Sequence, residues 1–291
     1  MALIVGVHGI GQQYTGSFEL RSLWFPALQD GLANAGHTER AGTLTEDVLH
    51  VSFFGDLLRP GEGAMGAGTP PYTSADVAAG PERELLEIWH DAVLAQEPEL
   101  APGDGAMGPG RVTAKVMLSR LAKSSVFTGI SERLLIGNLK QVTRFLKDEE
   151  FKKLVLERLN AEIKGDTRVL IGHSLGSIVA YEYLCRYRPS SVNAFITLGS
   201  PLGIDKMIFE KLTPRPEKGV GVWPGEVKRW VNIADTDDVV ALTTELAPLF
   251  DGSPAAASVE DVLVDNGNKP HAITRYLTAK ATGHVLHDAL S

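Results

Sequence analysis

TRVLIGHSLGSIV, residues 167–179, places an apolar run directly before the pentapeptide Gly172-His173-Ser174-Leu175-Gly176. The run predicts a buried strand over 168–171, and the helical spacing after the pentapeptide predicts a helix over 176–187. A serine between two such elements must occupy a sharp, strained turn, in which flanking glycines remove side chains that would collide with neighbours. We therefore expect the Ser174 hydroxyl to stand above the edge of a sheet.

The alternation of strand and helix extends outward from this turn. Strands are expected at 2–7, 48–54, 168–171, 192–198, 228–234 and 259–264, and helices at 18–35, 81–96, 151–159, 176–187, 203–212 and 272–281. Because alternating strands and helices form mainly parallel sheets with helices on both faces, the sequence predicts an α/β fold with a mainly parallel central sheet.

The composition changes between about residues 60 and 145. Stretches rich in Gly, Pro and Ala predict loops on both sides of the 81–96 helix, and helical spacing follows over 112–146, which Gly129 and Gly137 could interrupt. We expect one domain over 1–291 that carries this segment as a helical insertion. Its apolar faces either cover an acyl pocket as a lid or pack on the core, and the sequence favours neither.

Charge and cysteine content narrow the class of protein. The 291 residues carry a net charge of −8, which argues against nucleic-acid binding because that needs a basic face. One cysteine, Cys185, allows no internal disulfide, and the short apolar start lacks the basic region of a signal peptide. We expect a cytoplasmic protein, although a secreted form with its signal removed stays open. Membrane contact through a local patch and the oligomeric state are also open.

The pentapeptide in its strand–turn–helix setting resembles the nucleophile turn of the α/β-hydrolase superfamily, most of all its lipase and esterase members. The resemblance covers the alternating core and leaves out the insertion. It implies that Ser174 is a nucleophile, followed along the chain by an acid and then by a histidine. A strand–helix turn with an incidental serine is the alternative.

The resemblance directs the search for the acid to WVNIADTDDVVAL, residues 230–242, where a strand is expected to end. The stretch offers Asp235, Asp237 and Asp238. Lipases carry an Asp followed by two apolar residues at a similar strand end, so Asp238 is the expected acid. Asp235 is the second choice, as a residue that braces the loop. All three could instead be solvated, and three close acids do not define a calcium site.

The histidine is expected in NGNKPHAITRYL, residues 266–277. His271 lies there, with Tyr276 five residues later, a spacing similar to that of lipases. His284 and His287 are alternatives on a terminal helix. His50 and His90 precede Ser174, so the order implied by the resemblance disfavours them.

The resemblance also implies the roles of these residues. His271 would take the proton of Ser174 and pass it to the leaving alcohol, while Asp238 would hold the imidazole ring. No metal or organic cofactor is needed for this chemistry.

Two backbone N–H groups would complete the site as an oxyanion hole. One belongs to Leu175, directly after the serine. The stretch ALIVGVHGIGQ, residues 2–12, contains a V-H-G-x-G turn similar to one in lipases, which assigns the second donor to Ile10. His8 is then expected to brace this turn rather than to act as a base.

The expected function is a serine hydrolase that cleaves carboxylic esters through an acyl-enzyme, with a lipid or fatty-acyl ester as substrate. An amidase or peptidase, a thioesterase or an acyltransferase would use the same residues, because leaving-group preference depends on the pocket. A non-catalytic α/β-hydrolase scaffold that binds a partner or a small ligand is the third hypothesis.

Overall fold

In the computed structural model, which describes residues 2–59, 72–101, 112–127, 130–251 and 258–291, six strands form one parallel sheet. Their order is β2-β1-β3-β4-β6-β8. The strands are β1 (Ile4–Val7), β2 (Leu49–Ser52), β3 (Val169–His173), β4 (Ala194–Leu198), β6 (Arg229–Asp235) and β8 (Glu260–Val264). Two short strands, β5 (Gly221–Val222) and β7 (Phe250–Asp251), pair separately. The predicted α/β fold with a parallel central sheet is confirmed.

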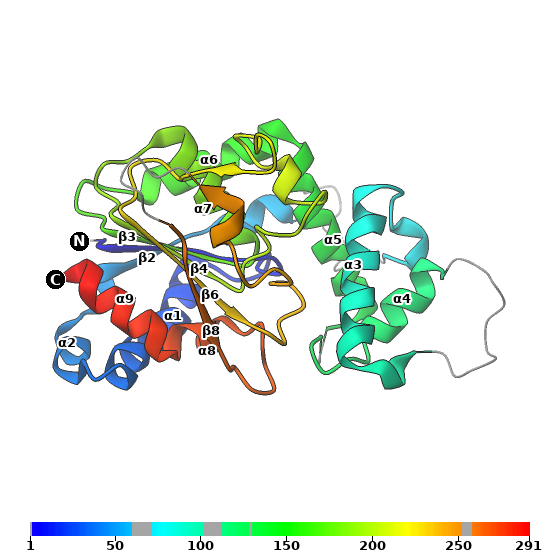
Figure 1. Cartoon of the computed structure of the whole chain (residues 1–291), viewed down its shortest axis with the longest axis horizontal. Coiled ribbons are helices and arrows are strands. Elements are labelled where there is room, and N and C mark those ends of the chain that lie inside the picture. The colour runs from blue at the N-terminus through cyan, green and yellow to red at the C-terminus, as the bar shows by residue number, and fades with distance from the viewer. Residues whose placement is uncertain (1, 60–71, 102–111, 128–129, 252–257) are drawn as a thin grey trace.

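Helices cover both faces of this sheet (Figure 1). Because successive strand residues point to opposite faces, Ile4 and Ile171 pack in one buried apolar cluster, whereas Val5 and Leu170 pack in the other. The first face carries α1 (Ser17–Asn34), α2 (Thr38–Thr43), α8 (Ile273–Thr278) and α9 (Lys280–Leu290), and the second carries α6 (Glu149–Glu162) and α7 (Leu175–Tyr187). β3 therefore runs through a core that is apolar on both sides.

Three helices stand beside one end of the sheet (Figure 1). They are α3 (Pro81–Gln96), α4 (Ala114–Leu121) and α5 (Glu132–Lys147). Side chains of α3 reach the carboxyl-terminal edge of the sheet, where Leu85 and Trp89 line a pocket together with Ser174. The segment expected as an insertion thus contacts the site. The loops expected in its Gly- and Pro-rich parts fall largely outside the described residues, as does Gly129.

The helix expected over 203–212 does not form, and the possible break at Gly137 does not occur. Residues 203–212 form turns and a short 3₁₀ helix at Phe209–Lys211, because Lys206 has a left-handed backbone (φ +51°) and the Asp205 carboxylate accepts its N–H. Gly137 does not interrupt α5, which begins where the Ser131 hydroxyl accepts the N–H of Leu134.

The C-terminal helix expected over 272–281 is two helices. Ala279 has an extended backbone (ψ 140°), which ends α8 and starts α9 in a new direction. The Thr282 hydroxyl donates to the carbonyl of Tyr276 and holds the two helices at this bend.

Within the described ranges, no helix has the length and apolar content that a membrane crossing requires.

A buried ion pair joins the two helices behind the Ser174 turn. Lys152 on α6 and Glu182 on α7 have side chains only 3% and 1% exposed, and Nζ lies 3.0 Å from Oε2. The Thr213 N–H donates to Glu182 Oε1 over 3.0 Å, so the pair also holds the following loop. Removing one member of such a pair leaves a buried charge uncompensated.

Lys152→Met should lower the free energy of unfolding by about 3–5 kcal/mol near pH 8, because Glu182 then loses its counter-charge. Burial raises the pKa of Glu182 to about 7, so this carboxyl can take up a proton in acid. We therefore expect a smaller loss at about pH 5.5, where the neutral form dominates.

Urea unfolding at both pH values measures these losses. The double variant Lys152→Met/Glu182→Gln is the control: it keeps an acceptor for the Thr213 N–H and removes both charges, so it should recover most of the stability. A loss below about 1 kcal/mol for Lys152→Met at both pH values would contradict a stabilising role for the pair.

Candidate active site

Ser174 is the only residue between β3 and α7, and its backbone is strained as predicted. Its φ of +54° is rare for a residue with a side chain. The Ser174 N–H donates to Leu198 at the end of β4 over 3.1 Å. The Ser177 N–H and hydroxyl both donate to the Ser174 carbonyl, over 2.9 and 2.6 Å. These bonds hold the strained conformation from both sides.

The two glycines of the pentapeptide are needed for close packing around this turn. A side-chain carbon on Gly172 would lie 2.5 Å from Cα of Ser177. One on Gly176 would collide with the carbonyl oxygens of Val7 and His8 at the end of β1. Gly176 therefore lets the start of α7 lie directly against the turn that follows β1.

His271 and Asp238 meet although they lie 33 positions apart in the sequence. Nδ1 of His271 lies 2.7 Å from Oδ2 of Asp238, whose side chain is fully buried. The Tyr276 hydroxyl donates to the same oxygen over 2.8 Å, and the Val240 N–H donates to Oδ1 over 2.9 Å. A carboxylate held this way orients the imidazole ring and leaves Nε2 available for a proton.

Burial alone would raise the pKa of Asp238. The charge of His271 and the hydrogen bonds from His271, Tyr276 and Val240 outweigh burial, so the pKa of Asp238 lies below its usual value. The acid beside His271 therefore stays ionised at neutral pH.

Among the described residues, neither of the other two acids of this stretch is hydrogen-bonded to His271. The carboxylate of Asp235 accepts the N–H groups of Asp237 and Asn266, so Asp235 braces two loops, as its second-choice assignment supposed. The Asn266 amide in turn donates to the Pro270 carbonyl over 2.9 Å, next to His271. The side chain of Asp237 is exposed.

The alternative histidines have partners elsewhere. His287 stacks on His37 with ring centroids 3.6 Å apart, and His284 meets the same ring edge-on at 5.5 Å. Nδ1 of His50 lies 3.0 Å from Glu162, and His90 is bonded to its neighbours on the insertion.

Among the described residues, no group of three or more His, Cys, Asp and Glu side chains could hold a metal ion.

His8 braces the turn after β1, as expected. Nδ1–H donates to the Gly9 carbonyl over 2.7 Å, and Nε2 accepts the Phe54 N–H over 3.2 Å. Both ring nitrogens are thus used by a neutral ring. Burial lowers the pKa of His8 to about 4, which agrees with this neutral state.

Sequence reasoning missed the role of His173. Its Nε2–H donates to the backbone carbonyl of His271 over 3.1 Å, and the two rings lie 4.7 Å apart. Burial, together with the charge of His271, lowers the pKa of His173 to about 3. This neutral histidine holds the loop of His271 against the Ser174 turn. The sequence shows a histidine directly before Ser174, but no pattern in the sequence indicated that it would bond to the carbonyl of His271.

The Ile10 and Leu175 amides lie beside Ser174. Both residues line a pocket with the serine, and neither N–H donates to an acceptor among the described residues. A side-chain carbon on Gly9 would lie 2.7 Å from Cβ of Ser174, so the turn carrying Ile10 touches the serine. The Gln141 side chain accepts the next amide, that of Gly11, over 3.0 Å and fixes the turn.

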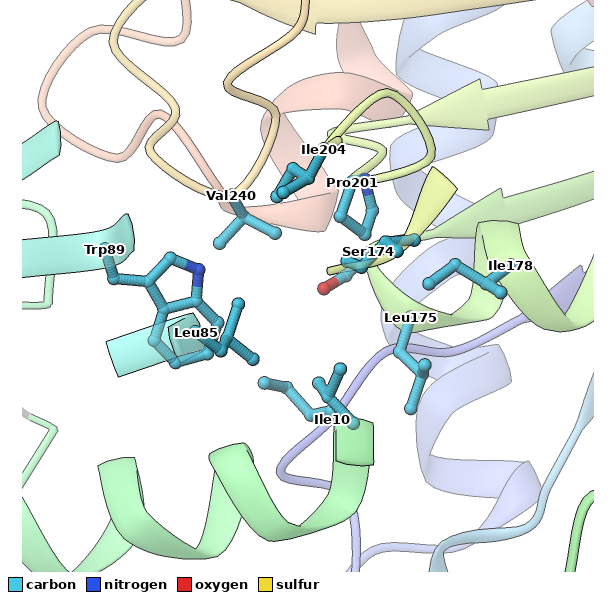
Figure 2. Close-up of a pocket in the computed structure, with 11 residues that line it drawn as sticks. Ile10, Leu85, Trp89, Ser174, Leu175, Ile178, Pro201, Ile204 and Val240 are labelled. Carbon is cyan, nitrogen blue, oxygen red and sulfur yellow. The ribbon is translucent and has the colours of Figure 1, made fainter. Parts of the chain in front are cut away.

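Ser174 lies between two cavities of different size. The smaller, of about 10 Å³, has room for about one water and is lined by aliphatic side chains and Trp89. The larger, of about 870 Å³, also contains His271, and it runs between α1 and the insertion. Figure 2 shows the Ser174 hydroxyl pointing into the space enclosed by Trp89, Leu85 and Val240.

The hydroxyl of Ser174 and the ring of His271 share the larger cavity, but no hydrogen bond joins them in the part of the chain that is described. Such a bond is often long in a protein without substrate and shortens when substrate binds. A serine that lies beside free backbone amides and shares a cavity with a histidine held by a carboxylate can act as a nucleophile.

Comparison of the sequence with family models, with curated proteins and with solved structures finds no match in any of the three. The geometry of the site is therefore the basis for assigning a function.

His8→Gln keeps a donor and an acceptor at the turn but removes the titrating ring. In the wild type, the pKa of His8 falls from 6.5 to about 4 on folding, so the unfolded chain binds more protons in between. The free energy of unfolding should therefore decrease as the pH falls through this window, and less steeply in His8→Gln, by up to about 1.4 kcal/mol per pH unit.

Urea unfolding at several pH values between about 6.5 and 4 measures the two slopes. His173 changes the pH dependence of the free energy of unfolding in the same way in the wild type and in His8→Gln. Its contribution therefore cancels when the two slopes are subtracted. Equal slopes would show that His8 is not buried as a neutral ring.

Proposed function

We propose that the protein is an α/β-hydrolase that cleaves carboxylic esters with Ser174, His271 and Asp238. The observation that carries this proposal is the 2.7 Å pair of His271 and Asp238, placed in one cavity with a serine at positive φ. A serine in a strained turn at the carboxyl end of a central strand, with a carboxylate-held histidine beside it, is the arrangement that acyl transfer requires.

The reaction would begin when substrate brings the Ser174 hydroxyl to Nε2 of His271. Because Nδ1–H is donated to Asp238, Nε2 carries the free lone pair and takes the proton while Oγ attacks the ester carbonyl. The oxygen of the tetrahedral intermediate would accept the Leu175 and Ile10 amides, which have no acceptor among the described residues. His271 then protonates the leaving alcohol, and water hydrolyses the acyl-enzyme by the same steps.

The two cavities suggest where each half of the ester lies. The leaving alcohol takes its proton from His271, which lines only the larger cavity, so the alcohol half belongs there. The acyl half then points to the smaller pocket. Apolar side chains from α1 and the insertion, among them Leu20, Leu23 and Phe127, line the larger cavity and favour an apolar, lipid-like ester. A long fatty-acyl chain would require the smaller pocket to widen.

A fluorophosphonate probe tests the nucleophile. We expect it to label the wild type at Ser174 and to leave Ser174→Ala unlabelled, because the probe traps a serine that is activated by a base. Intact mass and peptide mapping locate the adduct. Absence of labelling in the folded wild type, or equal labelling of the variant, would refute the proposal.

A matched pair of variants tests the acid. Asp238→Asn should lower kcat for p-nitrophenyl butanoate by about 10⁴-fold, because the amide no longer favours the correct tautomer of His271. Asp237→Asn changes the neighbouring, exposed carboxylate and should leave kcat as in the wild type. Similar losses in both variants would contradict the assignment of Asp238.

A further inference from the structure

Trp89 carries a buried N–H group without a partner. Its side chain on α3 is 2% exposed, and Nε1 has no hydrogen-bond acceptor among the described residues. A buried donor left without an acceptor costs about 1–3 kcal/mol, so such a group calls for an explanation.

The indole ring lies at the junction of the two cavities. Trp89 lines both of them, as does Ser174. In Figure 2 the indole nitrogen is on the edge of the ring that faces the Ser174 hydroxyl across the pocket. The indole packs against Phe127, whose ring centroid is 5.7 Å away. The donor is therefore directed into the space that the substrate would occupy.

The smaller pocket offers this donor no polar side chain other than that of Ser174. The smaller pocket is otherwise lined by aliphatic side chains such as Leu85, Ile178 and Ile204, apart from the serine itself. A donor in an apolar pocket gains a hydrogen bond only when a ligand brings an acceptor, and it then discriminates against ligands that lack one.

We propose that Trp89 is a specificity-determining residue that donates a hydrogen bond to an oxygen of the acyl group. The inference rests on the proposed ester hydrolysis, which places the acyl half of the substrate beside Trp89. It names the substrate class as esters of short acyl groups that carry an ether, hydroxyl or carbonyl oxygen near the ester carbonyl, rather than plain alkanoates. A short acyl group would need the least widening of this small pocket.

Two isosteric pairs of esters test this. The first is p-nitrophenyl methoxyacetate against butanoate, and the second is p-nitrophenyl 3-methoxypropanoate against pentanoate. In each pair an oxygen replaces one methylene group. In at least one pair, Trp89→Phe should reduce the preference in kcat/KM for the oxygenated ester by about tenfold, the value of one hydrogen bond. The two esters of a pair differ in intrinsic reactivity. This difference cancels when the ratio of their kcat/KM values in Trp89→Phe is compared with the same ratio in the wild type.

Two controls separate this role from packing. Trp89→Phe should unfold at the same or a higher urea concentration than the wild type, because it removes an unpartnered donor and keeps an aromatic ring. Phe127→Leu changes the packing beside the indole in the larger cavity, which would hold the p-nitrophenol half common to all four esters, and should change kcat/KM for both esters of a pair by the same factor.

The outcomes are distinguishable. If the wild type turns over the esters but Trp89→Phe leaves both ratios unchanged, the role of Trp89 is refuted and the proposed hydrolysis stands. If the folded wild type turns over none of the four esters and is not labelled by fluorophosphonate, both are refuted.

Discussion

The close approach of α7 to the end of β1 is the constraint on which the rest of the site depends. Gly176 packs against the carbonyls of Val7 and His8, and this leaves one residue, Ser174, to connect β3 with α7 at positive φ. The same contact brings Gly9 against the serine. A side chain at Gly176 would therefore displace the proposed nucleophile, Ser174, and both proposed oxyanion amides together.

Three histidines near the turn differ in burial and partners, and these differences separate their roles. His8 and His173 are buried, bond to backbone groups and have lowered pKa values, so they support loops as neutral rings. His271 alone of the three bonds to a carboxylate, and its side chain is 25% exposed. Tyr276 completes the arrangement, because its hydroxyl donates to Asp238 and accepts the Asp235 N–H.

Patterns of neighbouring residues predicted the parts of the fold that depend on side-chain periodicity and on glycine positions. The Ser174 turn and the six parallel strands follow from apolar runs and glycine positions, and the pairing of His271 with Asp238 followed from a resemblance in chain order. The bend at Ala279 and the turns around Lys206 were missed, because local hydrogen bonds, from Thr282 to Tyr276 and from the Lys206 N–H to Asp205, hold backbone conformations that override the helical spacing. The role of Trp89 depends on a cavity, which no spacing along the chain reveals.

The proposed mechanism requires a covalent acyl-enzyme on Ser174. The most direct measurement is rapid mixing with p-nitrophenyl butanoate, followed by acid quenching and intact mass analysis. Because p-nitrophenolate leaves readily, acylation should outpace deacylation, and the proposed mechanism predicts a burst of p-nitrophenol close to one equivalent per enzyme and a butanoyl adduct on the peptide that contains Ser174. Unchanged hydrolysis by Ser174→Ala, or the same adduct in that variant, would contradict it.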